Sequence, residues 1–397
     1  MGKKFQVAIV GTGPAALMAA EVVSSSGIQV SIFEKRKTPA RKLLIAGSSG
    51  LNVAHETPTD QLFHQYSGSP NFWKNIFHQF PPEQWLSFIH QLGLKTFKGT
   101  SHRYFVEGMK AGKLVALWKK RLTQKKVTWH FDHEVVNFKK LTSHQIQLLF
   151  HHKPTQTFDA AIFCLGGASW EPVNEPISWP EIFQSKKISI APFTPSNVGF
   201  NVDWSRPFLN EAEGHPLKNV LLTTPRGFAQ GDIVITRYGL EGTPVYTVGT
   251  EGDATFDLKP DLNLKQLFEK ISRVKENLAP IRKVQKQLKL CPATLALLYH
   301  ETPDNELKDI KKLIQRIKCF PVTFKSRQNL EWAISSAGGL KLSELNSSLM
   351  VKKFPGVFAA GEMLDWDTIT GGFLIQACVS QGFCAGQGVL DYLGRLR

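Results

Sequence analysis

The first forty residues constrain the fold of this chain more than any other stretch. Residues 5–10 (FQVAIV) are an apolar run of strand length, and residues 11–16 (GTGPAA) follow at once. An Ala- and Val-rich stretch then predicts a helix that ends near Ser26, and a second strand-like run, residues 29–33, leads into Glu34. This order predicts a strand, a tight turn, a helix and a second strand, the βαβ unit of a Rossmann-type sheet.

The small residues of this turn match a dinucleotide-binding fingerprint. Gly11 permits the tight turn, Gly13 lets the backbone approach a pyrophosphate, and Ala16 lets the helix pack closely on the strand. Glu34 follows Gly11 by 34 − 11 = 23 residues, which places an acid where it can bind ribose hydroxyls. The predicted cofactor contacts here are Gly11, Gly13, Pro14, Ala15, Ala16, Glu34 and Lys35.

A second segment suited to a cofactor lies at residues 41–52 (RKLLIAGSSGLN). Two cations precede a Gly/Ser loop, in which backbone N–H groups can converge on phosphate or on the polar edge of a flat ring. The same residues could also form a flexible loop. The candidate contacts are Arg41, Lys42, Gly47, Ser48, Gly50 and Asn52.

The middle of the chain predicts two kinds of β-structure. Three strand-like runs between Lys126 and Phe150 predict a β-meander, and residues 158–164 predict a strand that ends at Gly166. Val135 and Gly166 are further candidate cofactor contacts. This order is similar to FAD-binding domains of the glutathione reductase type. Between about residues 195 and 257, short β-like runs, TPVYTV among them, then predict a small antiparallel barrel or sheet.

Basic residues concentrate in a helical segment. The chain carries a net charge of 48 − 33 = +15, and residues 265–327 supply fifteen Lys/Arg against six Asp/Glu. Such a surface suits an anionic partner, although a solvated helical face explains it equally well. The sequence shows no apolar run that approaches ~18 residues, and the strand at residue 5 leaves no room for a signal peptide, so we expect a cytoplasmic protein without a membrane span.

The C-terminal part predicts the rest of the cofactor site. Residues 356–362 read as a strand that ends in Gly361 and Glu362, and the last helix is predicted to begin with Thr370 as its N-cap. The acid could hold ribityl hydroxyls, and the helix N-terminus could stabilise negative charge on a reduced flavin. Gly371, Gly372, Phe373 and the glycines at 382, 386 and 388 would then pack on the cofactor; alternatively, the Gly-rich last helix packs against the first strand.

Four segments together resemble the HI0933-like flavoproteins, also called the BaiN-type or aminoacetone oxidase-like family of FAD-dependent oxidoreductases. They are residues 10–20 (VGTGPAALMAA), 41–52, 231–246 (GDIVITRYGLEGTPVY) and 356–377 (GVFAAGEMLDWDTITGGFLIQA). The resemblance implies a glutathione-reductase-like FAD-binding Rossmann domain of residues 1–195 and 335–397. It also implies an inserted β-barrel domain (196–257 and 320–334) and a helical domain (258–319) inserted in turn.

Two departures from the family pattern concern the site. Many members have Gly-Gly-Gly-Arg-Cys-Asn where residues 47–52 read GSSGLN, and many have Ser where this chain has Glu241. An Arg and a Cys near the flavin are therefore missing, and substrate identity does not transfer from other members.

The leading functional hypothesis is an FAD-dependent oxidoreductase that moves a hydride between a reduced donor, NAD(P)H, and a small organic acceptor. By the resemblance, Arg237, Tyr238 and Glu241 face the flavin and are the catalytic candidates, together with Arg103. Stabilisation of a turn explains Arg237 and Tyr238 equally well. One alternative is a flavoenzyme that modifies an RNA base, with the basic helices binding phosphates. A second alternative is a flavin-binding sensor without turnover.

Overall fold

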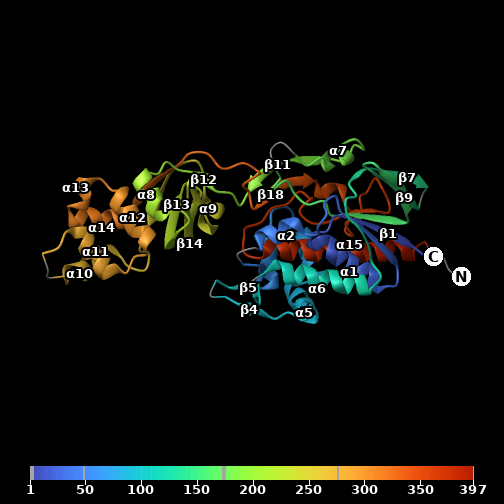
Figure 1. Cartoon of the computed structure of the whole chain (residues 1–397), viewed down its shortest axis with the longest axis horizontal. Helices are drawn as coiled ribbons and strands as arrows, with labels where there is room; N and C mark the ends of the chain where they lie inside the picture. The colour runs from blue at the N-terminus through green and yellow to red at the C-terminus, as the bar shows by residue number, and fades with distance from the viewer. Residues whose placement is uncertain are drawn as a thin grey trace. The chain divides into compact units, whose positions relative to one another are not determined.

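The computed structural model describes residues 4–47, 50–99, 101–108, 110–142, 144–171, 176–274 and 277–396. The chain forms two compact units, one of residues 1–194 and 334–397 and one of residues 195–333. Each unit has its own apolar core. Figure 1 shows the elements of both units along the chain.

A five-stranded parallel sheet lies at the centre of the first unit. Its strand order is β19-β10-β1-β2-β6, with Val7 paired to Ala160 on one side and to Val30 on the other. Its strands are β1 (Gln6–Val10), β2 (Gln29–Phe33), β6 (Thr128–His130), β10 (Ala160–Phe163) and β19 (Val357–Ala359). Because β19 comes from the C-terminal part, both ends of the chain build one sheet, and the Rossmann-type α/β prediction is confirmed.

Two long helices pack against each other beside this sheet. They are α1 (Pro14–Ser25) and α15 (Phe373–Gly394), which are in extensive contact (Figure 1). A Cβ at Gly382 would lie 2.2 Å from the carbonyl oxygen of Ala15, and one at Gly386 would lie 2.8 Å from Cβ of Val22. The prediction that these glycines pack on the cofactor is therefore wrong, since they let α15 approach α1.

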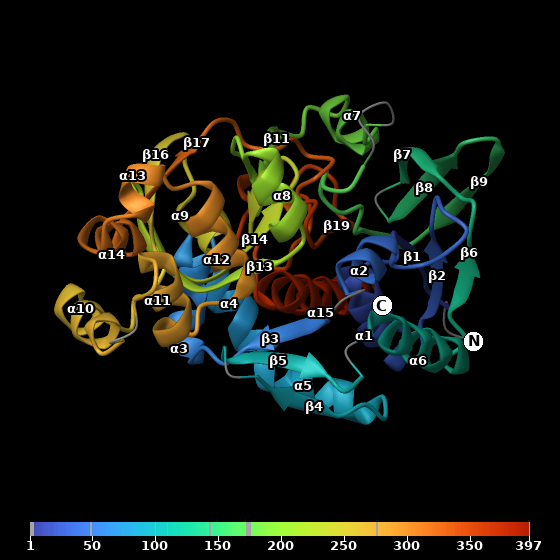
Figure 2. The ribbon, with the colours of Figure 1, turned by 60° about the vertical axis from the view of Figure 1, so that its left-hand side comes forward.

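The β-meander begins and ends one strand later in the sequence than predicted. It consists of β7 (Val135–Thr142), β8 (Gln145–Phe150) and β9 (Lys153–Phe158), in that order. The first of the predicted runs is instead β6, which pairs parallel to β2. A helix, α6 (Ala111–Gln124), crosses over before β6 and so returns the chain parallel to β2, whereas a meander needs hairpins. Figure 2 shows α1 and α6 on one side of the parallel sheet and the meander on the other.

Smaller elements complete the first unit. A three-stranded antiparallel sheet has the order β3-β5-β4, and a two-stranded sheet pairs β11 with β18. Two helices lie on either side of Pro81; they are α4 (Pro70–Gln79) and α5 (Pro82–Gln91). The others are α2 (Arg41–Ala46), β3 (Asn52–His55), α3 (Thr59–Leu62), η1 (Phe63–Gln65), β4 (Thr96–Lys98), β5 (Arg103–Val106), α7 (Trp179–Gln184), β11 (Ile190–Ser196), β18 (Ser335–Leu340) and η2 (Leu342–Glu344).

The second unit is built on a six-stranded sheet with the order β12-β15-β14-β13-β16-β17. Its two edges meet, because Asn201 N–H donates to the carbonyl of Ser326 at 2.8 Å and Gln328 N–H to that of Gly199 at 2.9 Å. The strands are β12 (Phe200–Asn201), β13 (Pro216–Thr224), β14 (Gly227–Thr236), β15 (Gly239–Glu241), β16 (Gly252–Asp257) and β17 (Phe320–Phe324).

One predicted strand of this unit is a helix. The run TPVYTV forms α9 (Thr243–Val248), in which Tyr246 N–H bonds to the carbonyl of Gly242 at 3.0 Å. Pro244 lies in its first turn, where a missing N–H costs nothing, and Gly242 takes a left-handed φ of 121° that turns the chain out of β15. These two residues outweigh the β-propensity of the Val, Thr and Tyr residues.

The helices between β16 and β17 share their core with the sheet. Leu267 and Leu313 from the helices and Leu217 and Ile233 from the strands belong to one buried cluster. Besides α9, the helices of this unit are α8 (Arg206–Ala212), α10 (Leu264–Ser272), α11 (Pro280–Leu288), α12 (Pro292–His300), α13 (Asp304–Leu307) and α14 (Ile310–Lys318). A separate helical domain of residues 258–319 stays a prediction.

Among the described residues, one helix is long and apolar enough to cross a membrane. It is α15, and 72% of its most apolar window is buried inside the protein, as in the core helix of a globular unit. Gln and Ser residues interrupt its apolar residues, so this helix is not a continuous apolar run in the sequence.

Candidate functional site

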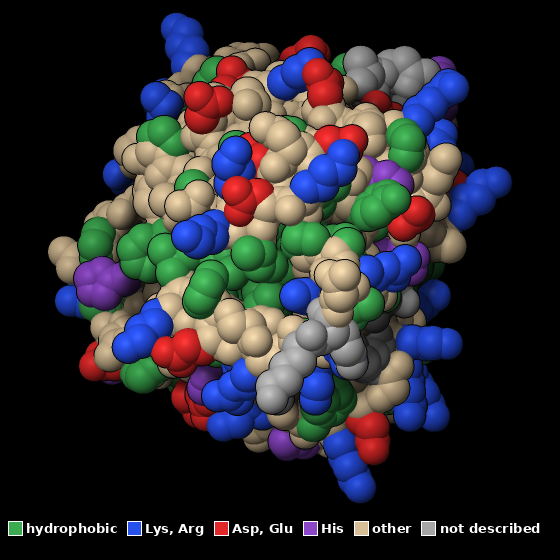
Figure 3. All heavy atoms as spheres, turned by 90° about the vertical axis from the view of Figure 1, so that its left-hand side faces the viewer, with side chains coloured by type: hydrophobic (Ala, Val, Ile, Leu, Met, Phe, Trp, Pro, Cys, Tyr) green, Lys and Arg blue, Asp and Glu red, His purple; other side chains and the backbone are tan. Residues whose placement is uncertain are grey.

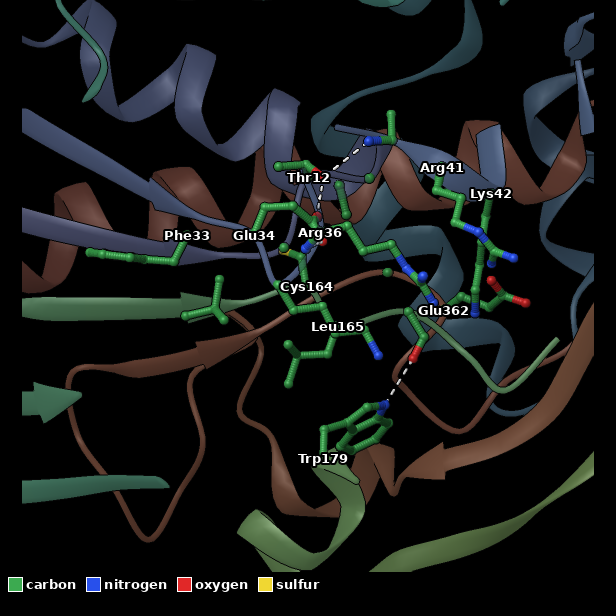
Figure 4. Close-up of a pocket in the computed structure, with 18 of the residues that line it drawn as sticks. Thr12, Phe33, Glu34, Arg36, Arg41, Lys42, Cys164, Leu165, Trp179 and Glu362 are labelled. Carbon is green, nitrogen blue, oxygen red and sulfur yellow. Dashed lines mark hydrogen bonds between the residues drawn. The ribbon is translucent and has the colours of Figure 1, made fainter. Parts of the chain in front are cut away.

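A cleft opens at the carboxyl ends of β1, β2 and β10 in the first unit (Figure 4). The turn after β1 forms one wall. Gly11 has a φ of +105°, and its N–H bonds to the carbonyl of Phe33 at 2.8 Å, while a Cβ there would lie 2.2 Å from the carbonyl oxygen of Cys164. Only glycine fits at this position. At Gly13 a Cβ would meet no described atom within 4 Å, so its backbone faces open space.

Glu34 is held at the end of β2 by hydrogen bonds to its carboxylate. The hydroxyl of Thr12 donates to Glu34 Oε2, and Arg36 N–H donates to Oε1 at 3.0 Å. The Thr12 hydroxyl also accepts a hydrogen bond from Ala40 N–H at 3.0 Å. This network orients an acid towards the cleft, where it can accept hydroxyl donors.

Three cations converge on one side of the cleft: Arg36, Arg41 and Lys42 (Figure 4). Lys42 Nζ donates to the carbonyl of Gly167 at 2.6 Å. Burial lowers the pKa of Lys42, although Glu362 and Glu171 oppose this effect by their charge. Together with the N-terminus of α1, these side chains form a site for anionic groups.

Glu362 lies in the cleft beside Lys42, three residues after the end of β19 (Figure 4). Its Oε1 accepts a hydrogen bond from Ser336 N–H at 3.2 Å. Burial raises the pKa of Glu362, and the charge of Lys42 opposes that rise. The lining of the cleft therefore contains two acids, which follow β2 and β19, and a cationic region near the N-terminus of α1.

Twelve of the predicted cofactor contacts line this cleft. They are Gly11, Gly13, Pro14, Ala15, Glu34, Lys35, Arg41, Lys42, Val135, Gly166, Gly361 and Glu362. Ala16 is buried within α1 and is not part of the lining, and Ser48 lies outside the described residues. Gly47 ends α2, where a Cβ would lie 2.5 Å from Cβ of Ala111.

The cleft also contains residues that the motifs did not indicate. Thr12 is an unspecified position of the fingerprint, and Glu171 and Trp179 come from a segment without a recognisable pattern. Arg36 belongs to a run of three cations after Glu34, and that run was the signal that could have identified it. Trp179 Nε1–H donates to the carbonyl of Gly166 at 3.2 Å and covers that side of the cleft (Figure 4).

The other predicted contacts form a second group at the start of α15, outside the cleft lining. A Cβ at Gly371 would lie 3.1 Å from Arg103 Nε, one at Gly372 would lie 2.7 Å from the backbone of Ala54, and the ring of Phe373 stacks on His55 at 4.8 Å. Gly372 is the N-cap residue of α15, with a φ of +98°, so the prediction that Thr370 caps this helix is wrong. The left-handed turn at Gly372 starts the helix later than the Thr signal suggested.

Asn52 belongs near this second group because β3 contacts α15, and Gly50 lies just before that strand. The side-chain oxygen Oδ1 of Asn52 is buried and has no hydrogen-bond partner among the described residues. A buried acceptor of this kind is costly without a donor. It therefore marks a position where the edge of a bound ring could donate a hydrogen bond.

The catalytic candidates of the second unit separate into two places. Tyr238 donates its hydroxyl hydrogen bond to Glu241 Oε1, and burial, together with that carboxylate, raises the pKa of Tyr238. Burial also raises the pKa of Tyr246, and Glu241 adds to that rise. Arg237, by contrast, is 83% exposed and forms an ion pair with Glu213 at 3.4 Å. Tyr238 and Glu241 are thus brought together, and Arg237 is not part of their cluster.

The HI0933-like protein Rossmann domain model matches residues 5–388. The chain belongs to the HI0933-like family. This confirms the resemblance stated from the sequence, together with the class of flavoprotein oxidoreductase. The match includes the fingerprint turn, the cationic segment of α2 and the Gly361–Glu362 corner, so the family assignment covers the whole cleft.

Two curated relatives of this HI0933-like chain are full-length matches of low identity. A 3-dehydro-bile acid delta(4,6)-reductase of Clostridium scindens is 24% identical over 97% of this chain and 99% of its own length. A ribosomal RNA dihydrouridine synthase of Escherichia coli K12 is 21% identical over 98% of each chain.

Solved structures show the same fold. The 3-ketosteroid delta4-(5alpha)-dehydrogenase of Rhodococcus jostii RHA1 aligns with a TM-score of 0.55 at 12% identity, covering 98% of both chains. The 3-ketosteroid delta1-dehydrogenase of Sterolibacterium denitrificans aligns with a TM-score of 0.54 at 10% identity, covering 98% of this chain and 99% of that one.

Proposed function

We propose that this chain is an FAD-dependent oxidoreductase that transfers a hydride between a reduced donor, NAD(P)H, and an organic acceptor. The observation that carries the proposal is the cleft in which the open backbone at Gly13 lies between two acids, Glu34 and Glu362. Family membership supports a flavin as the redox group.

The residues present fit FAD in three places. Glu34 would accept the ribose hydroxyls, and the α1 N-terminus with Arg41 and Lys42 would hold the pyrophosphate. Glu362 would accept ribityl hydroxyls, and the unpartnered Oδ1 of Asn52 offers an acceptor to the ring edge. The inserted β-barrel and the helices of residues 258–319 belong to this proposal as two parts of one unit with a shared core.

When bound, the flavin would supply reversible hydride transfer, and the protein would orient the substrate and control its protons. We assign proton delivery to Tyr238, whose raised pKa keeps the phenol protonated and whose hydroxyl is oriented by Glu241. Arg103, beside Gly371, is assigned to substrate orientation. Arg237 is assigned to substrate binding at the protein surface and not to proton transfer, because its side chain is exposed.

The activities named for the relatives suggest the type of acceptor. A reductase of a 3-dehydro-bile acid and a synthase of dihydrouridine both add hydrogen to an unsaturated substrate. We therefore propose an acceptor with an electron-poor carbon–carbon double bond, which takes a hydride at one carbon and a proton from Tyr238 at the other.

An anaerobic absorption spectrum of the purified protein, recorded before and after NADPH and then NADH, tests this function. A flavin band that bleaches with either nucleotide is expected. A band that persists would exclude these donors, and a protein that neither contains a flavin nor binds added FAD would refute the proposal. A flavin that bleaches but is reoxidised by no electron-poor alkene would favour the sensor alternative.

A second candidate function is the modification of an RNA base. We propose a cytoplasmic location for the protein with either function. The basic segment of residues 265–327 and the names of two relatives favour it. Figure 3 shows hydrophobic side chains at the centre of the face that contains α10–α14, with Lys and Arg around them, and Phe268 and Tyr299 are 44% and 60% exposed. Exposed aromatics among cations suit single-stranded nucleic acid. RNA binding that weakens steeply with salt would support this function, and its absence at low salt would exclude it.

A further inference from the structure

The loop after β10 covers the cationic side of the cleft. The carbonyl of Gly167 accepts a hydrogen bond from Lys42, and the carbonyl of Trp170 accepts one from Arg41 Nη1 at 3.1 Å. Each of these two cations therefore already has a partner in the loop.

Glu171 is one of the acids beside these cations; another is Glu362, whose charge also acts on Lys42. Oε2 of Glu171 accepts a hydrogen bond from Arg36 Nη2 at 2.8 Å, and its Oε1 lies 3.8 Å from Lys42 Nζ. The side chain of Glu171 is only 8% exposed, so its charge is compensated mainly by these two cations. Removing either cation from a buried carboxylate is costly because the charge would be left unpaired.

The same cations border the N-terminus of α1 and the open backbone at Gly13, where the proposed function places a pyrophosphate. A pyrophosphate is a stronger and more highly charged acceptor than a carboxylate, and Arg binds it in bidentate fashion. A pyrophosphate bound there would compete with Glu171 for Arg36 Nη2 and for the charge of Lys42.

We propose that Glu171 is an internal competitor of the cofactor's pyrophosphate and thereby determines the affinity of the cleft for dinucleotides. The inference rests on the proposed function. On binding, Arg36 and Lys42 exchange the carboxylate for the pyrophosphate, and Glu171 turns towards solvent. The cost of that exchange lowers the affinity for diphosphates but does not affect a nucleoside without phosphate.

The test is calorimetric titration of the full-length, flavin-free protein with ADP and with adenosine. Glu171→Gln removes the competing charge and retains the side-chain shape. Glu134→Gln is the matched control, because Glu134 lines the same cleft but lies at hydrogen-bond distance only from the Ser178 hydroxyl, at 3.5 Å. Both variants raise the net charge by one. A difference in ADP affinity between them therefore reports on the contacts of Glu171 and not on the overall charge.

We expect E171Q to bind ADP about tenfold more tightly than the wild type and adenosine equally well, since the gain arises at the phosphates. E134Q should change either affinity by less than about threefold, as expected for an acid without a cation partner. If E171Q does not fold, Glu171→Asp, which is too short to reach both cations, should show a smaller gain for ADP alone.

An unchanged or weaker affinity of E171Q for ADP would overturn the inference while leaving the proposed function intact. An equal gain for adenosine would also overturn it, because it would indicate general opening of the cleft. If the wild type and the variants are folded but bind neither ADP nor FAD, both the proposed function and this inference fail.

Discussion

Two glycines of the fingerprint turn differ at the level of single atoms. Gly11 combines a left-handed φ with a carbonyl oxygen 2.2 Å from the position of a Cβ, whereas Gly13 has an ordinary φ of −70° and open space beside it. The fold requires glycine at position 11, whereas at position 13 the ligand of the cleft requires it. Substitution separates these two requirements.

Gly11→Ala should lower the free energy of unfolding by roughly 3 kcal/mol, because the residue must leave its φ or displace Cys164. Gly13→Ala should stay within roughly 1 kcal/mol of the wild type, but should weaken FAD binding about tenfold or more by blocking backbone approach. Thermal unfolding and flavin fluorescence titration measure the two effects. Equal stability loss in both variants would contradict this assignment.

The buried carboxyl of Glu362 should make stability depend on pH. Burial raises its pKa in the folded protein, so the folded state binds more protons than the unfolded state between the unfolded pKa, ~4.3, and the folded one. The stabilisation by the protonated acid is complete below the unfolded pKa and is lost as the pH rises through the folded pKa. Glu362→Gln removes this dependence.

The difference in unfolding midpoint between E362Q and the flavin-free wild type should therefore increase in favour of E362Q as the pH rises above about 4.3. A series of thermal melts at increasing pH measures it. A difference that stays constant across the series would show that Glu362 does not titrate in this range.

The sequence predicted the residues of the cleft better than it predicted their partners. Gly11, Gly13 and Glu34 follow from a local pattern, since a turn and a strand end are set by neighbouring residues. Thr12, Glu171 and Trp179 act through contacts that the fold creates between distant segments, and no local spacing encodes such contacts.

At the scale of elements, the type of an element could be predicted more reliably than its packing partner. The central strands and α1 match their predictions, because apolar runs and a Pro at the helix start are strong local signals. The run TPVYTV became α9 and the first run of the predicted meander joined the parallel sheet, since tertiary context decided both. Gly382 and Gly386 of α15 are close-packing positions, as predicted, but their partner is α1, and Gly388 lies against Ser348.

That contact can be tested within one helix. Gly382→Ala places a methyl group 2.2 Å from the Ala15 carbonyl and should cost roughly 2–4 kcal/mol by forcing the helices apart. Gly394→Ala, where a Cβ meets no described atom within 4 Å, should change stability by less than about 1 kcal/mol. Urea unfolding compares them, and a G382A protein as stable as the wild type would exclude close α1–α15 packing.

At the scale of the whole molecule, the two units have separate cores, and the second combines strands and helices in one core. We therefore expect residues 195–333 to unfold as one cooperative transition rather than as a barrel and a helical domain. Leu267 and Leu313 of the helices are fully buried, and they lie in the same apolar cluster as Leu217 of β13.

Leu217→Ala in β13 and Leu313→Ala in α14 should each destabilise this unit by roughly 2–5 kcal/mol. Hydrogen exchange should then accelerate in both the strands and the helices in either variant. Faster exchange confined to α10–α14 in L313A would show that the helices unfold independently.

The construction of the central sheet from both ends of the chain also determines when the protein can fold during its synthesis. The ribosome completes β1, α1, β2 and β10 early, but β19 and α15 follow only after the whole of residues 195–333. Until then the nearly fully buried side chains of α1 have no α15 to cover them. The second unit can therefore fold on the ribosome while α1 of the first unit is still exposed. The nascent chain needs protection from aggregation at this apolar helix. No flavin can be retained before α15 has been synthesised.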